Sequence, residues 1–387
     1  MNSKQFETAK MCLKVVTPIN ISDGIVLGAK DYLYDSRRQK VYFLNLHQWH
    51  MFIYKHMLLE KYESYLANFR DKQSLLEWLR MQGYDIDDVR IVVTSEAQAT
   101  VNLMDNEKKK TLNDINRHIQ QPDGSLYVPG SSIKGLFRTA ILYSLLQKRQ
   151  DIKVKYWRQI QEKISSNYFK PYRDFNKLIS DLENELLHTL RLVDGNIHSN
   201  NAVYSAMRGL QVSDTYASRN MQTAILQKVD GGFDKFGKAS PKKLPIFREC
   251  MLPEAELFFD VKIEKAVMKT IGINSVDDLL KATHSFFAAV TDLLQQAFGK
   301  EYQEAFQGVA AGNMFLGGNT GFLSKTLLAM LAPDKDTAKN TIKVLLDKSF
   351  KNHKHLLRDK IIAPRTLKCT NYNGKLMLMG VAEVRKV

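Results

Sequence analysis

Cysteine is scarce in this sequence, and long apolar runs are missing. The 387 residues include only three cysteines, Cys12, Cys250 and Cys369, an odd number spread far apart. This distribution argues against a disulfide framework and against a Cys-x-x-Cys zinc site. The first residues lack the apolar core of a signal peptide, and no run approaches the length of a transmembrane helix. We therefore expect a soluble protein of the reducing cytoplasm.

Signatures of nucleotide hydrolysis and of metal binding are missing as well. Gly130 and Gly135 have the spacing of a phosphate-binding P-loop, but Leu136 and Phe137 stand where that loop needs lysine and serine or threonine. The histidines of the 46–82 stretch are not joined by Cys, Asp or Glu at the spacing of a metal site. The sequence therefore predicts neither an ATPase nor a bound metal or cofactor.

Positive charge, in contrast, is abundant. Lys and Arg number 56 against 41 Asp and Glu, a formal net charge of +15, and 44% of the residues are hydrophobic. The hydrophobic content indicates a folded protein, and the length favours two domains. The charge indicates a polyanionic partner. Because the sequence has no lipid-anchor motif and no basic amphipathic anchor at its start, nucleic acid is favoured over a membrane surface.

A helix start at residues 128–138 gives the clearest signal. Pro129 ends an extended segment, Ser131 or Ser132 can cap the first helical turn, and the apolar residues that follow recur at helical spacing. The positive end of a helix dipole and its free N–H groups favour an anion. The segment therefore predicts a helix N-terminus that binds phosphate.

Three further residues of this segment support that prediction. Lys134 and Arg138 are one helical turn apart near the same helix end. Gly135 costs helix stability, which makes sense if a backbone or a nucleotide must come close. The alternative is an ordinary amphipathic helix with solvated basic residues.

The second strong feature is the glycine-rich run GNMFLGGNTG at 312–321, which leads to Lys325 at an expected helix start. Four glycines allow successive backbone N–H groups to turn inward and form an anion-binding nest. The alternative is a close packing contact between two elements. Because Lys325 and the basic stretch behind it supply charge, we favour contact with an RNA backbone.

Residues 335–368 contain ten Lys and Arg against three Asp. This excess fits either a solvated helix face or a surface that follows phosphates. His353 and His355 in this stretch, and Asp23 in the first loop, could serve acid–base cleavage of RNA. An isolated histidine pair or a loop acid is a weak signal, so we expect no catalytic residue.

Extended segments bracket helices in both halves of the chain. We expect strands at 11–21, 40–44, 89–103, 255–263 and 376–384, a strand or hairpin at 202–216, a loop at 231–245, and helices at 46–82, 151–192, 276–297, 321–331 and 336–350. A boundary at 195–201 would divide the chain into residues 1–198, with a helical insertion at 46–82, and residues 199–387, with the glycine-rich loop 312–321. The pattern predicts an α+β fold.

Five segments in this order resemble the RAMP superfamily of CRISPR proteins, and as a set they resemble the family of the fifth Csm subunit of type III-A effector complexes. The segments are VTPINISDG (16–24), VPGSSIKGLFRTA (128–140), AMRGLQVSD (206–214), FLGGNTGFLSK (315–325) and LMLMGVAEV (376–384). The resemblance implies two ferredoxin-like, RRM-related domains. It also implies a non-catalytic subunit that caps the 3′ portion of the CRISPR RNA (crRNA), contacts the repeating Csm backbone subunit and supports crRNA maturation, while separate host nucleases do the cutting.

Carried over by position, the resemblance assigns RNA binding to ten residues: Gly130, Ser131, Ser132, Lys134, Arg138, Arg208, Gly317, Gly318, Gly321 and Lys325. Two alternatives remain open at this point. One is a metal-independent RAMP endoribonuclease, and the other is a capping subunit of the related Cmr complexes.

Overall fold

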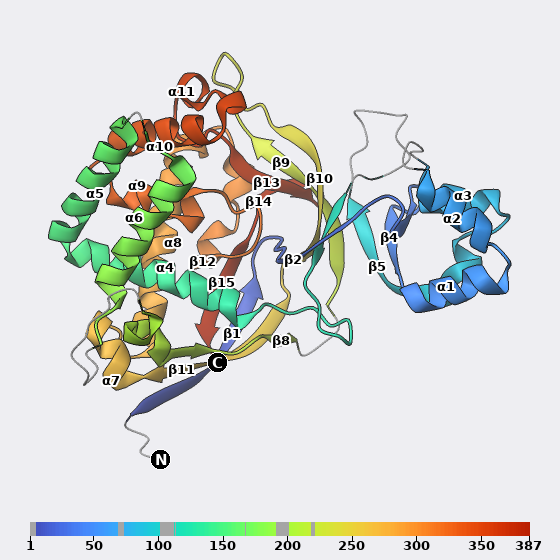
Figure 1. The fold of residues 1–387 in the computed structure, drawn as a ribbon, viewed down its shortest axis with the longest axis horizontal. Helices are drawn as coiled ribbons and strands as arrows, with labels where there is room; N and C mark the ends of the chain where they lie inside the picture. The colour runs from blue at the N-terminus through green and yellow to red at the C-terminus, as the bar shows by residue number, and fades with distance from the viewer. Residues whose placement is uncertain are drawn as a thin grey trace.

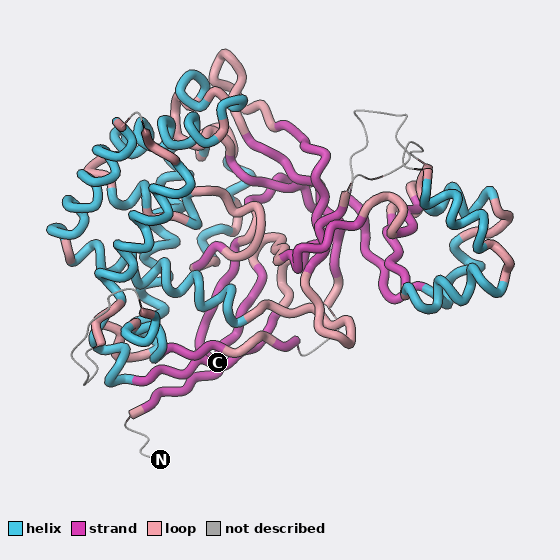
Figure 2. The backbone as a smooth tube through the Cα atoms, in the orientation of Figure 1, coloured by secondary structure: helices cyan, strands magenta, loops and turns pink. Residues whose placement is uncertain are grey.

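Strands form the centre of the computed structural model, as two sheets of six and nine strands over the described residues (Figure 1). The described residues are 5–68, 73–100, 112, 114–166, 168–190, 201–217 and 221–387. Most helices gather on one side of the strands, and a separate helical arm projects from the other side (Figure 2). The expected mixture of helix and sheet is confirmed.

Sheet A joins the first strand of the chain to strands from its second half. Its order is β12–β15–β1–β11–β7, and β8 also pairs with β11. Alternation along β1 places Met11, Leu13 and Val15 in the core with no exposed surface. The strands are β1 (Phe6–Val15), β7 (Leu210–Val212), β8 (Tyr216–Ala217), β11 (Glu256–Glu264), β12 (Met314–Phe315) and β15 (Val381–Lys386).

Sheet B has the order β2–β6–β10–β9–β5–β4–β3, and β13 joins β14 to β9. The strands are β2 (Ser22–Leu27), β3 (Tyr32–Asp35), β4 (Lys40–Leu44), β5 (Val93–Thr100), β6 (Ile115–His118), β9 (Thr223–Gly231), β10 (Lys242–Met251), β13 (Leu367–Tyr372) and β14 (Lys375–Leu378). Both sheets take strands from either side of residues 191–200, which lie outside the described residues. The division into domains 1–198 and 199–387 stays a prediction.

Two long helices, α4 and α8, pack against each other beside sheet A, and they contact β7 and β12, respectively. The main core contains Phe137 of α4, Phe287 of α8 and Phe259 of β11. The helices here are α4 (Gly130–Lys148), α5 (Gln150–Ser165), α6 (Pro171–Leu187), α7 (Lys265–Met268), α8 (Val276–Phe298), α9 (Leu328–Leu331), α10 (Lys335–Ser349) and α11 (His355–Arg358). None of the described helices is long and apolar enough to cross a membrane.

The helical arm follows β4 and has its own core. Its elements are α1 (Leu46–Lys55), α2 (Leu59–Ala67), α3 (Leu75–Met81) and the short 3₁₀ helix η1 (Ile86–Val92). Trp49, Tyr62 and Trp78 pack together in this core, which is separate from the main one. The arm lies at the end of sheet B away from α4 and α8 (Figure 1).

Several expectations for individual elements are wrong. The segment 202–216, expected as a strand or hairpin, begins with two 3₁₀ helices, η3 (Ala202–Tyr204) and η4 (Ala206–Gly209), and the strand expected at 89–103 begins only at Val93, after η1. The strand expected at 376–384 is two strands, β14 and β15, because Gly380 turns the chain at a φ of +81° and sends it from sheet B to sheet A. The helix expected at 321–331 is the 3₁₀ turn η8 (Leu323–Lys325) followed by the single turn α9. The loop expected at 231–245 is shorter, because β10 already begins at Lys242.

Candidate nucleic-acid interface

A groove of about 330 Å³ lies between α4 and the glycine-rich loop that follows β12. It brings together the two segments that the sequence singled out separately, although they are far apart along the chain. Helix α8 makes this possible, because it packs against α4 and also contacts β12, from which the loop leaves. The lining residues are Ile21, Ser22, Ser132, Gly135, Leu136, Thr139, Phe315, Leu316, Gly317, Gly318, Ser324 and Lys325.

The glycine-rich loop is pressed against the chain that enters β2. Gly317 has a φ of +89°, and a Cβ built on it would lie 2.3 Å from the carbonyl oxygen of Asn20. Gly318 donates its N–H to the same oxygen over 2.7 Å, and a Cβ there would lie 2.9 Å from Nη1 of Arg248. Close packing therefore explains these two glycines, and the N–H of Gly318 is already used within the protein.

Asn20 connects the loop to sheet B. The residue has no exposed surface. Its side-chain oxygen accepts a hydrogen bond of 2.9 Å from Nη1 of Arg248, and its amide nitrogen donates one of 2.8 Å to the carbonyl of Glu249. Because a buried amide with partners on both sides has one orientation, Asn20 fixes the glycine-rich loop and Arg248 relative to each other.

Two cations beside the loop, Lys325 and Arg248, have no carboxylate partner among the described residues. Desolvation lowers the pKa of Lys325, and the nearby guanidinium of Arg248 lowers it further, although Lys325 as a whole residue is exposed. Burial also lowers the pKa of Arg248, which is half-buried. Like charges held close together without an acid between them favour a bound anion.

The N-terminus of α4 differs from the expectation. The helix begins at Gly130 with Pro129 as its cap residue, so Ser131 and Ser132 lie inside the first turn and the expected serine cap is wrong. The N–H of Gly130 donates to Oδ1 of Asp214 over 2.7 Å. The protein's own carboxylate therefore already occupies this amide of the helix end.

Gly130 is required for packing. A Cβ built on it would lie 2.4 Å from the carbonyl oxygen of Val212. At Gly135, in contrast, no described atom lies within 4 Å of such a Cβ. Gly135 therefore faces the open groove, and no backbone of the described chain comes close to it.

Lys134 and Arg138 of α4 are not among the residues that line the groove. Lys134 is half-buried, and its pKa is lowered by desolvation and then by Arg138. Arg138 is 4.0 Å from Oε2 of Glu183. The groove lining therefore does not include these two cations, and Arg138 lies opposite an acid of α6.

The two remaining predicted residues lie apart from the groove lining. Arg208 is in the short helix η4 (Ala206–Gly209), where it is exposed and its Nη1 donates to the carbonyl of Val203 over 3.4 Å. Gly321 has a φ of +94° and lies beyond the groove, where a Cβ would be 3.5 Å from Cγ of Lys368.

No local sequence pattern pointed to the residues under the loop. Asn20 lies in the segment VTPINISDG (16–24), which resembles the family without assigning a role to Asn20 itself. Arg248 and Lys228 belong to strands β10 and β9, which local sequence patterns did not predict. Lys368 was one of many lysines in a basic stretch. Their proximity depends on strand pairing between distant segments.

The residues considered for acid–base cleavage serve local structure. His355 is buried, and its Nδ1 lies 2.8 Å from Oδ2 of Asp359, whose other oxygen is 2.8 Å from Nη1 of Arg365. The ring of His353 stacks on Phe350. Asp23 accepts a hydrogen bond of 2.7 Å from the N–H of Ile25. In the part of the chain that the structure describes, no group of three His, Cys, Asp or Glu residues could hold a metal ion.

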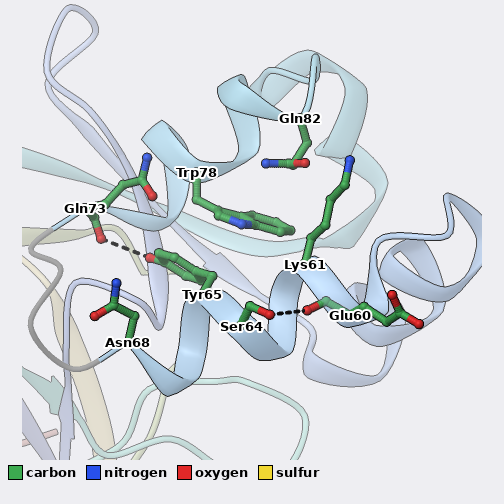
Figure 3. A pocket seen from close by; sticks show the side chains of 8 residues that line it. All are labelled: Glu60, Lys61, Ser64, Tyr65, Asn68, Gln73, Trp78 and Gln82. Atoms are coloured by element: carbon green, nitrogen blue, oxygen red, sulfur yellow. Dashed lines mark hydrogen bonds between the residues drawn. The ribbon is translucent and has the colours of Figure 1, made fainter.

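The arm contains another pocket, of about 450 Å³, between α2 and α3. Trp78 and Tyr65 lie at its centre, with polar side chains around them (Figure 3). Both rings are at least 95% buried, so neither presents a free face for stacking. Residues 46–92 contain seven acidic and six basic residues, whereas the whole chain has a charge of +15. The groove, and not this pocket, suits a polyanion.

Comparison with known proteins now identifies the family. Residues 12–322 match the family model of the RAMP superfamily. The chain belongs to the RAMP superfamily, and its predicted resemblance to the Csm5 proteins is confirmed by named relatives. A CRISPR system Cms protein Csm5 of Mycobacterium tuberculosis (strain CDC 1551 / Oshkosh) is 27% identical, over 98% of this chain and 97% of its own length. The Csm5 of Streptococcus thermophilus is 22% identical, over 83% of this chain and 80% of its own length.

Solved structures share the fold. A chain in the cryo-EM structure of a Csm–crRNA–target RNA ternary complex of a type III-A CRISPR–Cas system has a TM-score of 0.68 and 18% identity, over 98% of this chain and 100% of that one. The crystal structure of T.onnurineus Csm5 has a TM-score of 0.58 and 18% identity, over 96% of this chain and 99% of that one.

Proposed function

We propose that this chain is a non-catalytic RNA-binding subunit of a type III-A Csm effector complex. In this role it caps the 3′ end of the crRNA in the cytoplasm, contacts the Csm backbone subunits, and supports complex assembly and crRNA maturation by host nucleases. Two ferredoxin-like RAMP domains, residues 1–198 and residues 199–387, are part of the proposal. Membership of the RAMP superfamily and relatives named Csm5 support it.

One observation carries the RNA-binding part of the proposal. The groove between α4 and the glycine-rich loop is bordered by Lys325 and Arg248, cations without a carboxylate partner among the described residues. Backbone phosphates satisfy such cations without regard to base sequence. Binding of this kind suits a guide RNA, whose sequence must vary.

A charge reversal tests the groove. In Lys325→Glu we expect the purified protein to bind labelled single-stranded RNA of mixed sequence at least about tenfold more weakly, with a salt slope lower by about one. Lys134→Glu combined with Arg138→Glu should act in the same direction. The matched control is Lys269→Glu, an exposed lysine on the short helix η5 (Lys269–Ile271). Equal binding by the Lys325 variant and the control would contradict the groove assignment.

The role in the complex has its own test. The tagged chain is purified from its own cell, the bound RNA is sequenced, and the bound proteins are identified. Short RNAs with repeat-derived 3′ ends, together with Csm subunits, are the expected result. Recovery of Cmr subunits, or of RNA without repeat-derived ends, would refute the capping role, and defined cleavage of repeat RNA by the purified chain in chelator would refute the non-catalytic assignment.

A further inference from the structure

A second group of cations lies on sheet B beside the glycine-rich loop, and it shares Arg248 with the border of the groove. It consists of Lys228 on β9, Arg248 on β10 and Lys368 on β13, and we call it the sheet B patch. Arg248 is opposite Leu226, and Lys368 is opposite Asp230. Because alternate residues of a strand share a face, Leu226, Lys228 and Asp230 point to the same side, and so do their partners.

The patch contains one carboxylate for three cations. Oδ1 of Asp230 is 2.9 Å from Nζ of Lys368 and 3.7 Å from Nζ of Lys228. The side chains of Lys228 and Lys368 remain 18% and 20% exposed, so they are desolvated but reachable. Burial lowers the pKa of Lys228, and the charge of Lys368 lowers it further. Asp230 therefore leaves most of the positive charge uncompensated.

The patch and the groove are continuous around the loop. Nη1 of Arg248 is 2.9 Å from a Cβ built at Gly318, which lines the groove, and Arg248 also acts on the pKa of Lys325. Cγ of Lys368 is 3.5 Å from a Cβ built at Gly321, at the end of the loop. Lys325, Arg248, Lys228 and Lys368 therefore follow one another around the glycine-rich loop.

We propose that the sheet B patch binds backbone phosphates of the same single-stranded RNA after the strand leaves the groove and crosses the glycine-rich loop. This inference rests on the proposed function, because it extends the RNA path that begins in the groove. RNA is favoured over an acidic protein segment because the uncompensated charge continues from the groove without a break. Under this proposal Asp230 weakens RNA binding, since its carboxylate lies beside Lys228 and Lys368 on the path.

The role assigned to Asp230 can be tested by a substitution that should strengthen RNA binding. Asp230→Asn keeps the size and an oxygen acceptor for Lys368 but removes the negative charge. We expect this variant to bind labelled single-stranded RNA of mixed sequence several-fold more tightly, with a steeper salt dependence. A triple variant, Lys228→Gln with Asp230→Asn and Lys368→Gln, leaves no unpaired carboxylate behind. It should bind roughly tenfold more weakly than Asp230→Asn, with a salt slope lower by about two.

The outcomes separate this inference from the proposed function. If Asp230→Asn and the triple variant bind RNA like the natural protein while Lys325→Glu binds weakly, the patch is structural and the inference is wrong, although the groove assignment stands. If Lys325→Glu is also unchanged, the groove assignment fails as well. If the triple variant keeps its RNA affinity but loses a protein from the purified complex, the occupant is an acidic protein segment, which also overturns the inference. Thermal unfolding of each variant identifies any loss of binding caused by misfolding.

Discussion

Two glycines that line the same groove should respond in opposite ways to alanine. At Gly317 the φ of +89° disfavours any L side chain by about 1–2 kcal/mol. The new Cβ would also lie 2.3 Å from the carbonyl oxygen of Asn20, so the loop must move away. We expect Gly317→Ala to lower the free energy of unfolding by roughly 2–3 kcal/mol. At Gly135 the Cβ enters open space within a helix, so Gly135→Ala should raise it by about 0.5–1 kcal/mol.

Thermal unfolding and RNA binding together check this reasoning. For a chain of 387 residues, the expected changes correspond to a Tm lower by roughly 3 °C for Gly317→Ala and higher by about 1 °C for Gly135→Ala. RNA affinity should fall in both variants, because the first displaces the loop and the second narrows the groove. A Gly317→Ala protein with unchanged Tm and unchanged RNA affinity would refute the packing of the loop against Asn20.

Two more predictions concern the buried polar groups beneath the loop. Asn20→Ala removes the hydrogen-bond acceptor of Arg248 and the donor to the carbonyl of Glu249. The free energy of unfolding should therefore fall by about 3 kcal/mol, and RNA affinity should fall with it. A Tm equal to that of the natural protein within error would contradict this. Burial lowers the pKa of His118 from 6.5 to about 4. Between these values the unfolded chain binds a proton that the folded chain does not, so stability should fall by up to about 3 kcal/mol as the pH drops from 6.5 to 4. Denaturant unfolding of His118→Asn, whose amide oxygen can replace Nδ1 as acceptor for the N–H of Ile21, should show a flatter pH dependence, and an unchanged slope would disprove the assignment. Burial raises the pKa of Glu249, so this carboxyl group should make the folded protein more stable as the pH falls, opposite to the effect of His118. The natural protein and His118→Asn both contain Glu249, so comparing their pH dependences largely removes its contribution.

Local periodicity was sufficient for the long helices and for some strands. The expected helix at 276–297 is α8 (Val276–Phe298), and the expected strand at 40–44 is β4 (Lys40–Leu44). In α8 the apolar residues return every three or four positions because one face is buried against α4 and sheet A. A signal of this kind is contained in the segment itself, so one sequence is enough to detect it.

The central strands of sheet B could not be found in this way. β10 begins with Lys242 and Lys243, contains Pro245, and carries Arg248 and Glu249 next to each other. These residues are typical of a loop when the segment is considered alone. They are tolerated because partners from distant segments satisfy them: Asn20 accepts from Arg248, and Glu249 accepts from Thr223 and from the N–H of His118. The cations around the glycine-rich loop were missed for the same reason.

The N-terminus of α4 shows why a sequence motif can predict the helix start correctly and still leave out a residue that affects phosphate binding there. Serines, glycines and basic residues at a helix start predicted that the helix end itself binds phosphate. In the structure Asp214, from the segment after β7, accepts from the N–H of Gly130 and supplies negative charge at that end. A phosphate placed there would meet a carboxylate, and this repulsion would offset much of the attraction of the helix dipole. Under the proposed function, affinity for RNA would therefore come mainly from side-chain cations around the glycine-rich loop. It follows that charge changes at Lys325 and in the sheet B patch should alter RNA binding more than substitution of Ser131, whose side chain adds no charge.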